Sequence, residues 1–360
     1  MTKLMRKMTM LACGTTLLAA AFPMPARAAE SSAILPPAPT VEDKLAMEVK
    51  KESRNNIVTL VYENDMIGNG ADGEYTNGVR LGYLDVNAEF PLFAHRIADA
   101  IPGFDINETS SIFYSLGQNM FTPSDITLNP PPGDQRPYAG FLYGSVGMVT
   151  LTDNHSDEIE LTLGMVGPAS LAENTQKFVH RHITDSPLPK GWGQQLKNEP
   201  GIMLGWQRSY LEAESGEIGP LFWSFSPHYG LTLGNIYTFA NAGFSIRISP
   251  EDSRWQDKPM RVRPALPGSG FFEIPEKKWS WYLFGGVDCR AMARNIFLDG
   301  NSFTNSPSVD KNIFVADSNA GIAFTYDQTR ISYTVVHRTK EFADQRDSTV
   351  FGALTVGYRF

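Results

Sequence analysis

The C-terminal segment of the chain places the strongest constraint on its fold. Residues 349–360 alternate between apolar and small or polar side chains and end on an aromatic residue at the terminus itself. Successive side chains of a strand point to opposite faces, so this segment would have one apolar face along its whole length. That face consists of Leu354, Val356, Tyr358 and Phe360. A strand that closes a barrel in a lipid bilayer needs such a face, and the C-terminus therefore predicts a bacterial outer-membrane protein.

The N-terminus has the layout of a secretory signal peptide. A positively charged start is followed by a mostly apolar run and by small residues before the bond after Ala28. We predict cleavage at this bond, so that residues 1–28 are the signal peptide, residues 29–56 a lead-in and residues 57–360 the barrel. A lipoprotein anchored on Cys13 is the alternative, but few apolar residues precede this cysteine.

The mature chain is predicted to be acidic. Removing the leader with its four basic residues leaves 27 of the 31 Lys and Arg residues against 39 Asp and Glu residues, a net charge of −12. Proteins that bind nucleic acid usually present a positive surface, so we expect no nucleic-acid partner. A negative surface is suited to divalent cations, and we expect the chain to be a monomer integral to the outer membrane.

Segments with the same alternation recur along the mature chain at spacings that suit a β-meander. No stretch approaches the ~20 consecutive apolar residues of a membrane-spanning helix, whereas a barrel strand needs only about ten residues. The predicted strands are residues 57–65, 78–86, 111–119, 140–151, 158–167, 201–210, 221–233, 236–248, 279–290, 313–326, 330–338 and 349–360. This even number predicts an all-β fold, a twelve-stranded antiparallel transmembrane β-barrel. A soluble β-sandwich is the alternative.

The parity of the strands predicts which connections face outward. If both termini face the periplasm, the hairpin after the first strand and the loop after the fifth strand lie on the same outer side. Asn64 and Asp65 at the end of the first strand would then share this side with Thr76 before the second strand. Two inward connections, residues 87–110 and 249–278, are longer than typical periplasmic turns.

The outer loop after the fifth strand is predicted to contain a short helix. Ser170 and Glu173 have the spacing of a capping box, and an amphipathic run follows them. His180 would lie on this helix, on the same outer side of the barrel as the first hairpin.

Seven short motifs resemble those of the outer-membrane lipid A 3-O-deacylase family, in the order in which the family has them. The motifs are Tyr62-Glu63-Asn64-Asp65, Tyr75-Thr76-Asn77-Gly78, Gly117-Gln118-Asn119-Met120-Phe121-Thr122-Pro123, Arg136-Pro137-Tyr138-Ala139-Gly140, Gly167-Pro168-Ala169-Ser170, Val179-His180 and residues 192–200. Together they cover essentially the whole mature chain, from about residue 57 to residue 360.

The resemblance implies a short outer-loop helix beside the barrel wall, with the active site between them. It implies calcium-dependent hydrolysis of the ester-linked 3′-acyloxyacyl chain of lipid A, the membrane anchor of lipopolysaccharide, at the outer-membrane surface. Carried over residue by residue, it implies catalytic roles for His180, Asn64 and Thr76, with His180 as the general base. It also implies that Asp65 is a ligand of Ca²⁺.

This chemistry is reasonable for these residue types. A neutral imidazole can take a proton from water, and calcium, which prefers oxygen ligands, can stabilise the oxyanion that forms. No serine nucleophile is then needed, and no glycine-bracketed serine elbow occurs in the chain. The chain departs from the family pattern at two places: Arg136 replaces lysine as the only basic residue of 121–138, and Asp185 stands near the position of a glutamate.

Simpler interpretations of the same residues remain. Asn64 and Asp65 could end a strand in an ordinary hairpin turn, where both residue types are common. His180 and its neighbour His182 could lie on a solvated helix face. Two other functions also remain: an outer-membrane phospholipase A, which uses a serine, and a non-catalytic barrel that acts as a pore or has only a structural role.

Overall fold

The structure is a computed structural model of the chain. It describes residues 56–65, 67, 74–90, 92–99, 104, 106–152, 154–251, 261–262, 269–275 and 277–360. The predicted signal peptide and the predicted lead-in, except for Asn56, lie outside the described residues.

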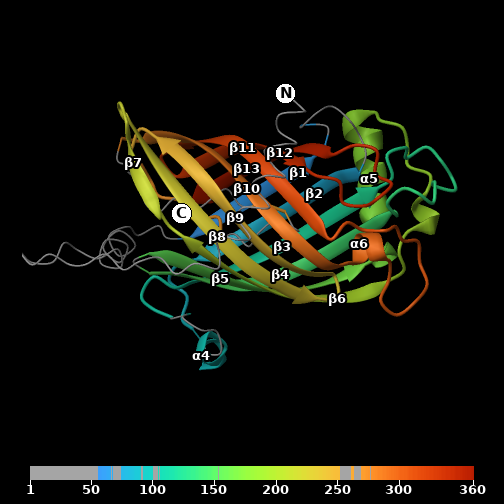
Figure 1. The fold of residues 1–360 in the computed structure, drawn as a ribbon, viewed down its shortest axis with the longest axis horizontal. Coiled ribbons are helices and arrows are strands. Elements are labelled where there is room, and N and C mark those ends of the chain that lie inside the picture. Colours follow the sequence, from blue (N-terminus) through green and yellow to red (C-terminus); the bar gives the residue numbers. More distant parts are fainter. Residues whose placement is uncertain are drawn as a thin grey trace, which may run out of the picture.

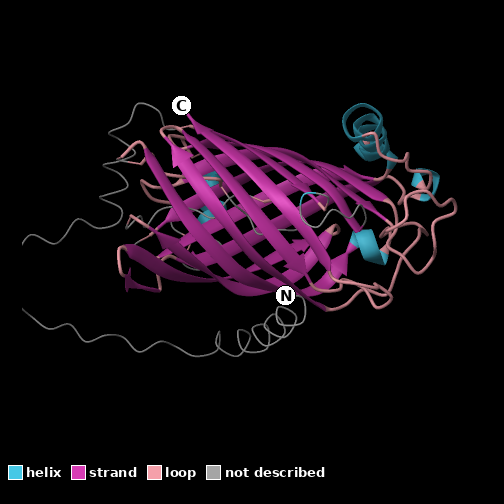
Figure 2. Ribbon diagram, turned by 90° about the horizontal axis from the view of Figure 1, so that it is seen from above, coloured by secondary structure: helices cyan, strands magenta, loops and turns pink. Residues whose placement is uncertain are grey.

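Twelve antiparallel strands close into a barrel, as predicted (Figure 1). The barrel strands are β1 (Ile57–Asn64), β2 (Glu74–Asp85), β3 (Ser111–Thr122), β4 (Ala139–Leu151), β5 (His155–Val166), β6 (Glu199–Tyr210), β8 (Leu221–Gly234), β9 (Tyr237–Ser249), β10 (Trp279–Asn295), β11 (Phe314–Tyr326), β12 (Thr329–Arg338) and β13 (Thr349–Arg359). Each strand pairs with the next, and the pairings of β1 with β13 and of β6 with β8 close the cylinder, which Figure 2 shows from the side.

A further short strand lies outside this count. β7 (Glu214–Ile218) pairs with the first residues of β8 and prolongs the hairpin between β6 and β8 beyond the barrel end. The sequence alternation did not predict β7, because most of its side chains are exposed on both faces.

Apolar side chains face outward and polar side chains face the lumen, as the alternation in the sequence predicts. In β13, Leu354, Val356 and Tyr358 are exposed on the outer surface, whereas Thr355 and Arg359 are buried inside the barrel. No helix in the described part of the chain is long and apolar enough to cross a membrane.

The two ends of the barrel carry different elements. Ile57 pairs with Arg359, so the first and last strands begin and end together at what we call the inner end. α4 (Leu92–Asp99) lies at this end in Figure 1, whereas α5 (Ala172–Val179) and α6 (Ile296–Asp299) lie at the opposite, outer end. The predicted short helix in the loop after the fifth strand is therefore present, at the same end as the tip of β1.

The two long inward connections have different structures. In the first, Ala94 and Ala98 of α4 pack with Phe104 against Met148 and Ile159 of the barrel wall. Ile159 belongs to the outward-facing side of β5, next to the inward-facing Glu158 and Glu160, so α4 covers the wall from outside.

The second long connection, between β9 and β10, enters the barrel. We call two of its described segments, residues 261–262 and 269–275, the luminal strap. At the inner end Phe272 packs with Ile57 and Phe113, and Arg330 of β12 donates a hydrogen bond to the carbonyl of Phe271. These strap residues therefore lie inside the barrel.

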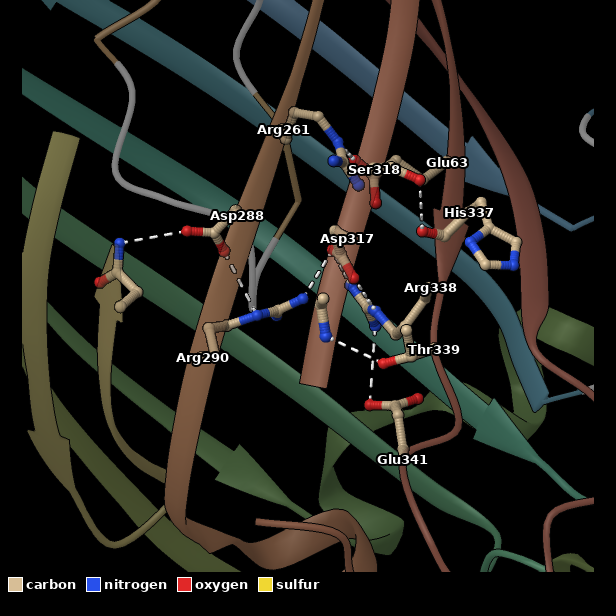
Figure 3. Close-up of polar contacts among 12 residues, drawn as sticks. Glu63, Arg261, Asp288, Arg290, Asp317, Ser318, His337, Arg338, Thr339 and Glu341 are labelled. Carbon is tan, nitrogen blue, oxygen red and sulfur yellow. Dashed lines mark hydrogen bonds and ion pairs between the residues drawn. The ribbon is translucent and has the colours of Figure 1, made fainter. Parts of the chain in front are cut away.

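Charged side chains of β10, β11 and β12 contact one another inside the barrel (Figure 3). Asp317 receives two hydrogen bonds of 2.8 Å from Arg338, and Nη2 of Arg290 lies 2.6 Å from it. Asp288 and Glu341 extend this network at its two ends, 3.4 Å from Arg290 and 3.7 Å from Arg338. Such pairing offsets part of the free-energy cost of burying these charges, because an isolated buried charge is strongly destabilising.

Aromatic and aliphatic side chains pack into one buried cluster towards the outer end. Its aromatic members are Phe121, Phe141, Tyr143, Tyr237, Phe239, Phe297 and Phe351. Together with the charged network and the strap, this cluster gives the barrel a packed interior.

Candidate active site on the outer wall

The end of β1 presents an amide to the outer side of the barrel wall. Glu63 points into the lumen, where Arg261 contacts it, so the next side chain, that of Asn64, points outward. Asn64 pairs with Asn77 of β2. Both amides are buried although they lie on the outward-facing side, so other parts of the protein cover them. Asp65 follows directly and is only 1% exposed.

The chain after Asp65 bends over the outer face of the wall. Tyr333 donates a hydrogen bond of 2.6 Å to the carbonyl of Ile67. Gly352 of β13 lies beneath this turn, and a Cβ atom at Gly352 would be 2.7 Å from the Ile67 carbonyl oxygen. A glycine is therefore required where the turn approaches the strand. Thr76 is placed by its backbone in β2, next to Asn77.

α5 is anchored on the outer face of the wall, a few strands away. The carbonyl of Ser170 accepts a hydrogen bond of 2.6 Å from the side-chain amide of Gln118. Gly140 lies directly under Ser170 and Ala172, and a Cβ atom at this glycine would collide with both side chains. The first turn of α5 can approach the wall only because residue 140 has no side chain.

The helix begins differently from the sequence prediction. Ser170 does not cap α5; it ends the short 3₁₀ turn η1 (Pro168–Ser170) and donates a hydrogen bond to the carbonyl of Gly167. Leu171, in a left-handed conformation with φ of 61°, is the residue before the helix, and Glu173 pairs with Lys177. The predicted capping box was wrong because the tight contact with Gly140 fixes Ser170 against the wall.

The direction of α5 brings its C-terminal end towards the first hairpin. Along the chain, η1 contacts β5 and β4, and α5 then contacts β4 and β3, so the helix runs across the strands towards β2 and β1. Figure 1 shows α5 crossing the outer ends of these strands. Eight helical residues advance about 12 Å, and two strand spacings are about 10 Å. The C-terminal end of α5, which His180 follows, is therefore directed from β4 towards β2 and β1, the strands that carry Asn77 and Asn64.

His180 is held by a contact that fixes its tautomer. It starts a single π-helical turn, η2 (His180–Thr184), and is only 6% exposed. Its Nδ1 lies 2.7 Å from the carbonyl oxygen of Pro187. A carbonyl oxygen only accepts hydrogen bonds, so Nδ1 carries a proton, and in the neutral form of the ring the lone pair is then on Nε2. π-Helical turns are rare and occur frequently at functional sites.

A second buried side chain on the same face of α5 was not predicted from the sequence. Gln176, one turn before His180, accepts a hydrogen bond of 2.7 Å from the indole N–H of Trp192. This contact fixes the orientation of the amide, and its Nε2 has no partner among the described residues. Trp192 itself packs with Met120, Tyr138 and Ala172. Gln118, Tyr138 and Trp192 occur in the sequence motifs, but only the structure shows that they anchor α5.

The neighbouring candidates have other environments. His182 is exposed and its ring packs at a tilt against that of Phe178, with ring centroids 4.9 Å apart. Asp185 is also exposed and ends the π turn in a left-handed conformation, with its backbone N–H donating to the carbonyl of His180. Arg136 points into the lumen, where it contacts Glu341 at 3.2 Å, so it does not lie on the outer wall with the candidate site residues.

The described residues contain no cluster of three or more acidic, histidine or cysteine side chains that could form a preformed metal site. Asp65 and Asn64 nevertheless place a carboxylate and an amide at adjacent positions. Oxygen donors of this kind suit calcium, which often completes its coordination with backbone oxygens, water or substrate. The donor types at the tip of β1 therefore fit a calcium ion.

The family model for "Outer membrane protein LpxR" matches residues 13–360. The chain belongs to the LpxR family. This match confirms the family resemblance of the sequence motifs. Together with the barrel, it identifies this LpxR-family chain as an integral protein of the outer membrane.

One solved structure supports the fold, and a second is less similar. LpxR from Salmonella typhimurium matches with a TM-score of 0.69 and 20% identity, covering 84% of this chain and 100% of that chain. The β-domain of the Bordetella autotransporter BrkA has a TM-score of 0.39 and 8% identity, over 86% of this chain and 99% of that chain. No curated protein matches the sequence.

Proposed function

We propose that this chain is a calcium-dependent lipid A deacylase that hydrolyses the ester-linked 3′-acyloxyacyl chain of lipid A. The observation that carries this proposal is the environment of His180. Its ring is buried on the outer side of the wall, and the bond to the Pro187 carbonyl leaves Nε2 available as a base. Membership of the LpxR family supports the choice of reaction.

In the proposed reaction Nε2 of His180 takes a proton from water while the water oxygen attacks the ester carbonyl carbon. The bond to the sugar oxygen then breaks, and His180 returns the proton to this oxygen, releasing the acyl chain as an acid. Asn64, Thr76 and Gln176 would orient the water and the ester. Asp65 would hold calcium, which, when bound, stabilises negative charge on the carbonyl oxygen.

The exposed face of α5 supports a lipid substrate. Phe178 of α5 is 58% exposed, and Leu171 just before the helix and Ile183 in η2 also expose more than half of their surface. Because α5 is fixed to the outer face of the wall, this apolar face lies beside the lipid-facing surface of the strands. Apolar helix faces of this kind enter the boundary between head groups and acyl chains. The ester bonds of lipid A lie in this boundary.

The packed lumen argues against the pore alternative. The described residues inside the barrel form an aromatic cluster, a paired charge network and the strap. A pore would instead need an open, polar, water-filled interior. Reconstituted protein is therefore expected to show no stable conductance in planar bilayers. Steps of open-channel current would favour a pore.

The decisive experiment is the mass profile of lipid A after expression of the chain, with and without a calcium chelator. We expect loss of the 3′-acyloxyacyl unit, and we expect the chelator to prevent it. His180→Ala should reduce the rate by at least about 10²-fold because the general base is lost. The matched control is His182→Ala, which removes an exposed histidine two residues away and should keep the activity.

The same profile tests the alternatives. Accumulation of lysophospholipid with unchanged lipid A would indicate a phospholipase A. Unchanged lipid A and phospholipid with the wild-type chain, or full activity of His180→Ala, would reject the proposed mechanism.

A further inference from the structure

The luminal strap reaches the inner side of the wall that carries the candidate site. The connection that contains the strap leaves the barrel wall at the inner end, after Ser249, and Trp279 begins the next wall strand at the same end. Arg261 nevertheless lies beside Glu63, one residue from the outer tip of β1. The described strap residues therefore extend from the inner end, where Phe272 lies, most of the way to the outer tip of β1.

Glu63 receives two hydrogen bonds from the strap on a single oxygen. Nε of Arg261 lies 2.7 Å from Oε1 of Glu63, and the backbone N–H of Val262 donates to the same oxygen at 3.1 Å. The carboxylate is 1% exposed, and Val262 packs on Val61, the preceding inward-facing residue of β1. Figure 3 shows the side chains of Arg261 and Glu63 approaching each other inside the barrel.

The strap is also held from β2. Arg80 donates a hydrogen bond of 3.3 Å to the carbonyl of Arg261, and the same guanidinium binds Glu160 of β5 at 2.9 Å. Arg80 lies three residues from Asn77 along β2. The tip of the strap therefore touches both strands whose outer ends carry the candidate site residues.

We propose that Arg261 is a positioning residue for the outer-wall site, acting through Glu63 on the end of β1. Neighbouring side chains of a strand share one backbone, so fixing Glu63 on the lumen side limits the movement of Asn64 and Asp65 on the other side. Charge-assisted hydrogen bonds in a buried environment are strong enough for this purpose. The inference rests on the proposed function for its catalytic consequence, but its structural consequence can be measured independently.

The test compares Arg261→Met with Arg330→Met. Arg330 holds the strap at the inner end, through the carbonyls of Gly270 and Phe271, so its loss disturbs the strap far from the site. We expect Arg261→Met to lower kcat for lipid A deacylation about tenfold with KM within about twofold, because small displacements of positioned groups reduce the chemical step. Arg330→Met should change neither parameter, and Arg261→Lys should restore part of kcat.

Hydrogen exchange supplies the second measurement. Arg261→Met should accelerate exchange of the amides of residues 62–65 and 77–79, whereas Arg330→Met should not. If Arg261→Met does not fold, the neutral pair Glu63→Gln with Arg261→Met replaces it, because this pair leaves no unpaired buried charge.

The outcomes separate the two proposals. Equal kcat and equal exchange in the Arg261 and Arg330 variants would overturn the positioning role. A wild-type chain that releases no acyl chain from lipid A would reject the proposed function, while the exchange measurement would still decide whether the strap holds the tip of β1.

Discussion

The lumen and the outer wall both contain buried polar groups, but they hold them in different ways. In the lumen, carboxylates and guanidinium groups from different strands neutralise one another, as Asp317 does with Arg290 and Arg338. On the outer wall, His180 is fixed through a backbone carbonyl, and one ring nitrogen remains available for proton transfer. The lumen groups are thus paired with one another, whereas the outer-wall groups form the site that we propose to be catalytic.

The largest effect that would test this contrast is expected in the lumen. Asp317→Ala leaves two guanidinium groups without their shared partner, and breaking a buried pair in this way costs about 3–5 kcal/mol of the free energy of unfolding. Urea unfolding of the refolded protein measures this change. Asp344→Ala, which removes an exposed carboxylate, is the control and should leave the unfolding midpoint unchanged. An equally stable Asp317 variant would mean that the network is not structural.

A smaller effect is expected at the anchor of α5. Trp192→Phe removes the indole N–H and leaves Oε1 of Gln176 buried without this donor, a cost of about 1–3 kcal/mol. This cost should weaken the docking of α5 and lower the deacylation rate while the unfolding midpoint of the barrel stays unchanged. Trp279→Phe, on the exposed outer face, is the matched control. A lower unfolding midpoint of the barrel with an unchanged deacylation rate would contradict the separation between the lumen, which is expected to stabilise the barrel, and the proposed site on the outer wall.

The smallest effect is expected on the exposed face of α5. Phe178→Ser removes an apolar side chain that is proposed to lie in lipid, and partial loss of its burial should cost about 1 kcal/mol. This corresponds to about a fivefold increase in KM for lipid A in mixed micelles, with kcat unchanged. Asn174→Ala, an exposed change on the same helix, should leave KM unaltered. A decrease in kcat alone would instead place Phe178 in the reaction chemistry.

The barrel was predictable because each strand carries its own signal. Alternation between lipid-facing and lumen-facing side chains is a local pattern, and all twelve predicted segments are strands in the structure. The strap was not predictable in this way. The residues that fix it, Glu63 and Arg261, are 198 positions apart, and no local pattern links them.

The candidate site was predictable only in part. Motifs and strand parity predicted that His180, Asn64 and Asp65 lie at one end of the barrel, and the structure places all three there. The orienting contact of His180 with Pro187 and the buried amide of Gln176 depend on how α5 docks on the wall. That docking requires that residue 140 has no side chain. The sequence alone does not show this requirement, because it does not show that β4 and α5 meet at Gly140.

The luminal strap also has a consequence for assembly. Arg261 contacts Glu63 of β1, and its guanidinium lies 5.3 Å from the ring centroid of Phe351 in β13. These two strands form the seam between the beginning and the end of the chain. The strap therefore links β1 and β13 from inside the barrel. Its contacts with both strands can form only after β13 has paired with β1.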